Sequence, residues 1–139
     1  MQVSMHLMFN GTCRDAFELY ARVFGGTIVG MFPYGTSPMD STVPPEWSEK
    51  VMHATLQIGD ATIAGADMYG ASYKAPQGFA AFVNPPSAAD AHRIFEALAE
   101  GGTVQMPIQE TFWSSAFGML VDRFGIPWEI NCETPAATT

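Results

Sequence analysis

One order of predicted secondary-structure elements occurs twice in this chain, and this repeat constrains the fold more than any single motif. A strand-like run, a helical run, the triplet Gly-Gly-Thr, a further strand and a hairpin follow one another in each half. The triplet that starts at Gly25 recurs at Gly101, 76 positions later. Such a repeat indicates two copies of one βαβββ unit. A lone unit of this kind has an exposed sheet edge and a half-covered sheet face, so the two copies should pair, within the chain or between two chains.

The two predicted modules share one order of elements, which gives an α+β protein with curved, mostly antiparallel sheets. The first module, at residues 1–67, contains a strand at 3–9, a helix at 13–24, a strand at 27–33, a long loop at 34–50 and a hairpin at 51–67. After a linker at 68–78, the second module, at 79–139, contains a strand at 79–84, a helix at 88–100, a strand that starts after the second triplet and a hairpin at 112–133. A loop as long as 34–50 is either a lid or wall of a site or a flexible surface excursion.

Local signals indicate where these elements begin and turn. Thr12, with Asp15 three residues on, resembles a capping box for the first helix, and Ser87 after two prolines caps the second. Asp122 and Gly125 suit a tight turn between two apolar strands, because Asp bonds to nearby backbone and Gly takes a positive φ. Apolar residues recur at helical spacing in both predicted helices, so each helix should pack an apolar stripe against its own sheet.

The charge balance disfavours several classes of partner. With 6 Lys and Arg against 14 Asp and Glu, the net charge is −8, which leaves no basic patch for nucleic acid or an anionic membrane. No apolar run approaches the roughly 20 residues of a membrane span, and the N-terminal residues lack the charged start of a signal peptide. We therefore expect a cytoplasmic protein in which Cys13 and Cys132 are reduced thiols.

Several short pieces, taken in order, resemble a known family. They are Phe9-Asn10-Gly11, Ala16–Tyr20, Val23–Gly26, Met52-His53-Ala54, Ile58-Gly59-Asp60, Trp113, Phe117-Gly118 and Asp122–Trp128. Their order and spacing resemble the PhnB-like branch of the vicinal-oxygen-chelate superfamily, which also holds glyoxalase I, extradiol dioxygenases and the fosfomycin and bleomycin resistance proteins. Members of this branch are often labelled similar to 3-demethylubiquinone-9 3-methyltransferase. No glycine-rich loop follows a parallel strand here, so we expect neither a nucleotide cofactor nor literal methyl transfer.

The resemblance implies half-barrel modules and a divalent metal held at the cavity-facing ends of the first and last strands. The candidate metal ligands in this chain are His6, His53, Asp67 and Glu129. Two His and a carboxylate can hold Zn, Mn, Fe or Ni with open positions for a substrate. The opening strand of the second module offers no strong ligand, and a lone strand His is more often a cavity-wall residue. His92, on the polar side of a helix, is expected in solvent.

Two functions remain open at this point. One is a metal-dependent lyase, isomerase or transferase of glyoxalase type, with Glu129 as the catalytic residue that moves a proton. The other is a metal-free binding protein of the bleomycin-resistance type, which holds a small molecule in an aromatic cavity. In either case Trp113, Phe117 and Gln57 are the predicted cavity wall. The resemblance also favours a homodimer in which each cavity is lined from both chains.

Overall fold

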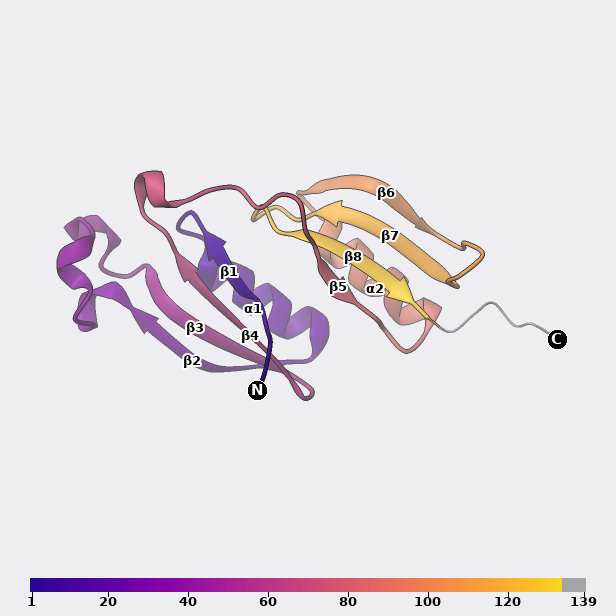
Figure 1. Cartoon of the computed structure of the whole chain (residues 1–139), viewed down its shortest axis with the longest axis horizontal. Helices are drawn as coiled ribbons and strands as arrows, with labels where there is room; N and C mark the ends of the chain where they lie inside the picture. Colours follow the sequence, from indigo (N-terminus) through magenta and orange to yellow (C-terminus); the bar gives the residue numbers. More distant parts are fainter. Residues whose placement is uncertain (134–139) are drawn as a thin grey trace. The chain divides into compact units, whose positions relative to one another are not determined.

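The computed structural model of the chain describes residues 1–133 and divides it into two compact units (Figure 1). The first unit comprises Met1–Lys74 and the second begins at Ala75, a division that falls within the predicted linker at 68–78. The last six residues of the predicted second module, 134–139, lie outside the described part of the chain. Among the described residues no helix is both long and apolar enough to cross a membrane.

The first unit is one four-stranded sheet with one helix. Its elements are β1 (His6–Phe9), α1 (Cys13–Phe24), β2 (Thr27–Pro33), β3 (Val51–Ile58) and β4 (Ala61–Asp67), with single-turn 3-10 helices η1 (Tyr34–Thr36), η2 (Asp40–Thr42) and η3 (Pro45–Trp47) between β2 and β3. The strand order is β1-β4-β3-β2. β1 runs parallel to β4, whereas the other neighbours are antiparallel.

The second unit repeats this arrangement after the short η4 (Gly70–Ser72). Its elements are β5 (Ala81–Val83), α2 (Ala88–Ala99), β6 (Thr103–Gln109), β7 (Ala116–Val121) and β8 (Pro127–Cys132). The strand order is β5-β8-β7-β6, and again only the first and last strands pair in parallel. The predicted α+β fold of two βαβββ modules with mostly antiparallel sheets is therefore confirmed.

In each unit the helix packs on one face of the sheet and leaves the other face open. In the first unit Ala16, Phe17, Tyr20 and Val23 of α1 are buried, as are Leu7, Phe9 and Leu56 of the sheet. A Cβ at Gly65 of β4 would lie 2.7 Å from the Phe17 ring, and one at Gly118 of β7 would lie 2.6 Å from Phe95 of α2. Because side chains alternate along a strand, the neighbours of these glycines point to the open faces.

One predicted helix cap forms and the other does not. The Ser87 hydroxyl accepts the Asp90 N–H at 3.1 Å, as expected for the start of α2. Thr12, however, makes no side-chain cap bond, so the predicted capping box with Asp15 is wrong. The N–H of Cys13, the first residue of α1, instead donates to Oδ1 of Asp67 at 2.9 Å. The start of α1 is thus capped by a carboxylate 54 positions away and not by the neighbouring Thr12.

The predicted turn before β8 forms as the sequence indicates. Oδ1 of Asp122 accepts the N–H groups of Phe124 at 2.9 Å and Ile126 at 3.0 Å, and Gly125 takes a φ of 93°. Oδ2 of Asp122 accepts the indole N–H of Trp128 at 2.8 Å. One buried carboxylate therefore fixes the turn and the first core side chain of β8 together.

Candidate functional site

The open face of the first sheet brings His6 and His53 together. His6 of β1 lies opposite Ala64 of β4, which lies opposite Thr55 of β3, and His53 is two residues from Thr55 on the same face. The two imidazole centroids are 6.0 Å apart. Alanines at 64 and 66 in the intervening strand leave room for the rings to meet across it.

The surroundings of this histidine pair are partly apolar. Burial, and then the neighbouring His53, lower the pKa of His6 below its ordinary value, which favours the neutral imidazole. Thr55 Oγ1 lies 3.4 Å from His53 Nε2. Met8 and Phe32 on the same face are exposed by 43% and 55%, so an apolar surface borders the pair. Gln57 continues this face toward solvent, where its side-chain N–H donates to the Gly59 carbonyl.

Asp67 is not brought together with the two histidines. It follows Ile63 and Gly65 on the helix-facing side of β4 and is 1% exposed. Oδ1 accepts the Cys13 N–H at 2.9 Å and Oδ2 accepts the Val51 N–H at 2.8 Å. The Tyr34 hydroxyl donates to the Asp67 carbonyl at 2.7 Å. Both carboxylate oxygens are thus engaged in joining α1 to β3, away from the open face.

Cys13 has no activated thiol. Burial, and then the charge of Asp67, raise the pKa of the Cys13 thiol far above its ordinary value. Cys132 is likewise buried. The side chains that remain for chemistry in the first unit are therefore those of the open face and of the strand ends.

The open face of the second sheet carries Glu129 beside apolar side chains. Glu129 of β8 lies between Phe82 of β5 and Met119 of β7. Two residues farther along these strands, Phe117 of β7 lies opposite Asn131 of β8. Trp113 packs edge-on against Phe117 with ring centroids 5.4 Å apart. The structure therefore places the predicted wall residues Trp113 and Phe117 on the same face as Glu129.

The same face holds buried polar atoms that the sequence analysis did not single out. Asn131 is 5% exposed, its amide lies 3.1 Å from that of Asn84, and its Oδ1 has no hydrogen-bond partner among residues 1–133. The hydroxyls of Thr111 and Ser115 are buried and unpartnered in the same described range. Buried polar groups without partners are rare because they are costly.

The donor set fits a metal ion only in part. Two imidazoles on one face are suitable ligands, with typical Zn–N bonds of about 2.0–2.1 Å. Within residues 1–133, however, no three His, Cys, Asp or Glu side chains group closely enough to hold an ion. The first unit therefore offers a pair of nitrogen ligands and no complete protein ligand set.

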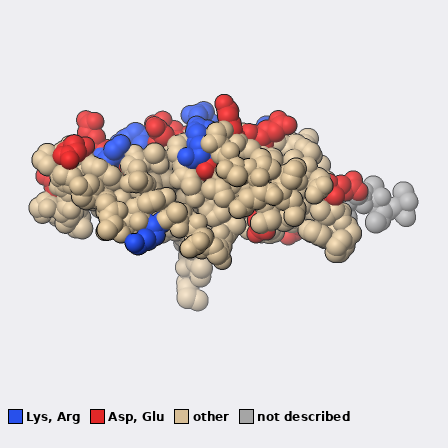
Figure 2. All heavy atoms as spheres, turned by 90° about the horizontal axis from the view of Figure 1, so that it is seen from above, with Lys and Arg blue, Asp and Glu red and all other residues tan. Residues whose placement is uncertain are grey.

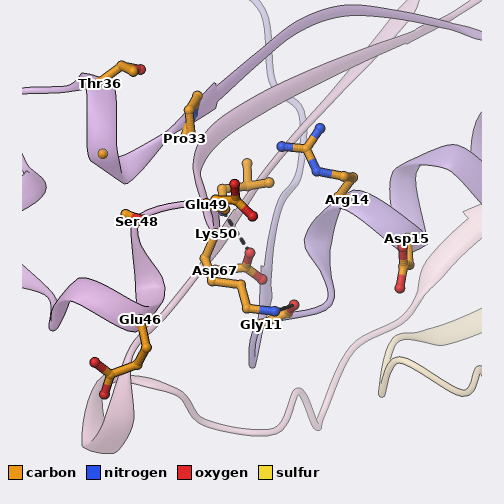
Figure 3. Close-up of a pocket in the computed structure, with 12 residues that line it drawn as sticks. Gly11, Arg14, Asp15, Pro33, Thr36, Glu46, Ser48, Glu49, Lys50 and Asp67 are labelled. Atoms are coloured by element: carbon orange, nitrogen blue, oxygen red, sulfur yellow. Dashed lines mark hydrogen bonds between the residues drawn. The ribbon is translucent and has the colours of Figure 1, made fainter.

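A hollow of about 830 Å³ lies at one end of the first unit, and sequence reasoning missed it (Figure 3). It is bordered by the end of β1, the start of α1 and the loop between β2 and β3. Its lining residues include Gly11, Arg14, Glu46, Glu49 and Lys50, with Asp67 beneath them. The loop at 34–50 was predicted to be either a lid or site wall or a surface excursion, and some of its residues line this hollow.

Comparison with known proteins gives a consistent family. Residues 1–131 match the family described as 3-demethylubiquinone-9 3-methyltransferase. The chain is 30% identical to protein YjdN of Escherichia coli, with 94% of this chain and 95% of that protein covered. The crystal structure of protein PA1353 from Pseudomonas aeruginosa is 45% identical, covers 96% of this chain and 98% of its own, and has a TM-score of 0.87.

More distant solved structures show the same fold. The PhnB protein of Bacillus cereus is 22% identical, covers 95% of this chain and 99% of its own, and has a TM-score of 0.81. Structures of the fosfomycin resistance and the glyoxalase, bleomycin resistance and dioxygenase kinds share the architecture at 15% and 16% identity. The predicted glyoxalase-like and bleomycin-resistance-like fold is thereby confirmed.

Proposed function

Because this chain belongs to the family described as 3-demethylubiquinone-9 3-methyltransferase, in the PhnB-like branch of the vicinal-oxygen-chelate superfamily, we propose that it binds a small, partly aromatic molecule on the open faces of its sheets without needing a metal. The observation that carries this proposal is the open face of the first sheet. There the histidine pair borders exposed Met8 and Phe32, while Asp67 points away. Such a face suits an apolar molecule with one or two polar groups.

The second sheet supports the same class of ligand. The edge-on pair of Trp113 and Phe117 offers an aromatic surface, and Trp113 is 47% exposed. In Figure 2, most of the visible surface carries neither Lys and Arg nor Asp and Glu side chains. A weakly charged, aromatic surface with a few polar atoms is typical of small-molecule sites.

We do not extend the family's methyltransferase description to this chain. Folds that bind nucleotide-like cofactors commonly do so at the carboxyl ends of a parallel sheet, where the strand order reverses. Each sheet here is mostly antiparallel and has the order first, fourth, third, second. Function is argued from sites rather than from fold names, and the sites here favour binding of a small molecule.

The histidine pair favours a second candidate, a metal-dependent lyase, isomerase or transferase of glyoxalase type. His6 and His53 would hold the ion, and Glu129 is the proposed further ligand or proton carrier. A divalent ion would polarise paired oxygens of a substrate. This candidate needs a ligand from outside the open face of the first sheet, and for that reason we rank it second.

Titration with the fluorescent probe 1-anilinonaphthalene-8-sulfonate separates the two candidates. Untagged protein should bind the probe equally well before and after treatment with EDTA. Trp113→Ala should weaken binding by about fivefold or more, because stacking on an aromatic ring contributes roughly 0.5–1.5 kcal/mol beyond its area. His92→Ala, an exposed change on α2, is the matched control and should leave binding unchanged.

The opposite result would favour the metal enzyme. It would consist of a stoichiometric metal by elemental analysis, loss of probe binding in EDTA, and restoration by Zn²⁺ in wild type but not in His6→Ala. Protonation of the histidines would then weaken metal binding as the pH falls, because only neutral imidazole binds metal.

We further propose that the protein works as a homodimer. Each unit leaves one sheet face uncovered by its helix, and apolar side chains such as Phe82 and Phe32 on those faces are more than half exposed. Interfaces that cover such faces in obligate dimers usually exceed about 2,000 Å² in total. Light scattering should therefore give twice the 15.0 kDa mass of the chain. A folded monomer that persists at nanomolar concentration would contradict this proposal.

A further inference from the structure

The hollow of Figure 3 is a built feature rather than a gap between loops. Its floor is held by Asp67, whose carboxylate accepts two backbone N–H groups, and by Tyr34, whose hydroxyl donates to the Asp67 carbonyl. One wall is the 34–50 loop, where Gly35 N–H donates to the Ser48 carbonyl at 2.8 Å. The residues that line it are therefore held in place by hydrogen bonds that do not involve a ligand.

Two cationic side chains line this hollow, in a chain that has few. Only 6 of the 139 residues are Lys or Arg, and Arg14 and Lys50 are both in the lining. Over residues 1–133 the one ion pair, between Arg93 and Asp90, lies elsewhere, so neither lining cation is paired with a carboxylate. The lining also holds four carboxylates, so an anion would be bound there only by direct contact with these two cations.

Arg14 lies at a position where a positive charge is unfavourable for helix α1. It is the second residue of α1, and the N-terminal end of a helix carries a partial positive charge. A cation there is disfavoured. The helix end already has an anion, the Asp67 carboxylate that accepts the Cys13 N–H, so a further anion would be held by the guanidinium. In Figure 3 the Arg14 side chain extends over the hollow.

Lys50 is positioned from the opposite side. Its ammonium donates to the Gly11 carbonyl at 2.9 Å, which leaves two of its three N–H donors for another partner. Gly11 has a φ of 90°, and a Cβ there would lie 3.4 Å from the Lys50 side chain. The positive φ is what favours glycine here, because a Cβ at 3.4 Å from Lys50 would be in ordinary contact.

Carboxylates also border the hollow and limit what it can bind. Glu46 points away from the two cations in Figure 3, whereas Glu49 lies over the middle. Asp15 lies at the rim, and Asp67 is already occupied by backbone N–H groups. A simple anion would be repelled by Glu49. A molecule that also carries a donor group would be held by it.

We propose that this hollow binds a small polar metabolite through an oxyanion, either phosphate or carboxylate, placed between Arg14 and Lys50. Glu49 accepts a hydrogen bond from a hydroxyl or ammonium group of the same molecule. Charge-assisted bonds of this kind are about twice as strong as neutral ones, and the guanidinium fork suits both oxyanions. The site is at the strand ends and shares no residue with the histidine face, so it stands or falls separately from the proposed function.

Titration of the full-length protein by two-dimensional NMR tests this proposal. Inorganic phosphate and malate, a hydroxy-carboxylate, are added separately at constant ionic strength. Saturable shifts are expected for the backbone amides of Gly11, Arg14 and Lys50. A response to one probe alone identifies the oxyanion, and a response to both shows that the site accepts either.

Matched variants test whether the charges of Arg14 and Lys50 contribute to binding of the probes. Arg14→Gln and Lys50→Met should each weaken binding by about fivefold or more, and Lys50→Arg should retain it because the charge is kept. Arg22→Gln, an exposed change at the other end of α1, and Lys74→Met are controls that should bind like wild type. Equal affinity in all variants, or shifts scattered over the surface without saturation, would overturn the proposal.

Discussion

Replacing Asp67 by alanine is expected to lower the free energy of unfolding of the first unit by about 3–5 kcal/mol. The carboxylate is 1% exposed, and each oxygen accepts one backbone N–H, from Cys13 at the start of α1 and from Val51 at the start of β3. Without it both buried donors lose their partner, which costs about 1–3 kcal/mol for each. Urea denaturation followed by circular dichroism measures the change.

Two further variants make the Asp67 result specific. Asp67→Asn keeps one acceptor oxygen but turns a donor amide toward the other N–H, so it should be nearly as destabilising as alanine. Asp60→Ala, at the exposed tip of the β3–β4 hairpin, should change the free energy of unfolding by less than about 0.5 kcal/mol. A loss of under about 1 kcal/mol for Asp67→Ala would show that the carboxylate is not needed to join α1 to β3.

Replacing Asp122 by alanine should destabilise the second unit by a similar amount, about 3–5 kcal/mol. Its carboxylate is 3% exposed and accepts three donors: the N–H groups of Phe124 and Ile126 and the indole of Trp128. The variant removes an anchor of the turn and leaves a buried indole N–H unpaired. Urea denaturation followed by tryptophan fluorescence measures it.

The control for this change is Glu96→Ala, an exposed carboxylate on α2, which should change the free energy of unfolding by less than about 0.5 kcal/mol. Asp122→Asn should again fall close to alanine, because one of the donors meets an amide N–H. Unfolding of Asp122→Ala at the wild-type urea concentration would contradict this account of the turn.

The sequence predicted those features that depend on neighbours in the chain. The Ser87 cap and the Asp122–Gly125 turn rest on contacts within four residues, and both formed. Strand alternation placed Leu7 and Phe9 inside and His6 outside. Because His6 and His53 both lie on polar faces of their strands, their meeting on one sheet face followed from the pattern.

Features that depend on contacts between residues far apart in the chain could not be predicted from the sequence. Asp67 was predicted as a metal ligand, but the backbone N–H groups of Cys13 and Val51 lie 54 and 16 positions from it and take both its oxygens. Arg14 and Lys50 are 36 positions apart and gave no motif. Their common place in the lining of the hollow depends on the path of the loop at 34–50, which the hydrogen bond between Tyr34 and the Asp67 carbonyl helps to fix.

The lengths of the outer strands affect how the folded chain resists polymerisation. β1 and β5, which form one edge of each sheet, contain four and three residues. β2 and β6, at the opposite edges, contain seven residues each, but both have register shifts and a proline, Pro33 or Pro107. An incoming strand would find few consecutive free donors and acceptors along any of these edges. Growth of cross-β fibrils from the native state should therefore be slow, and fibrils would have to start from unfolded chains.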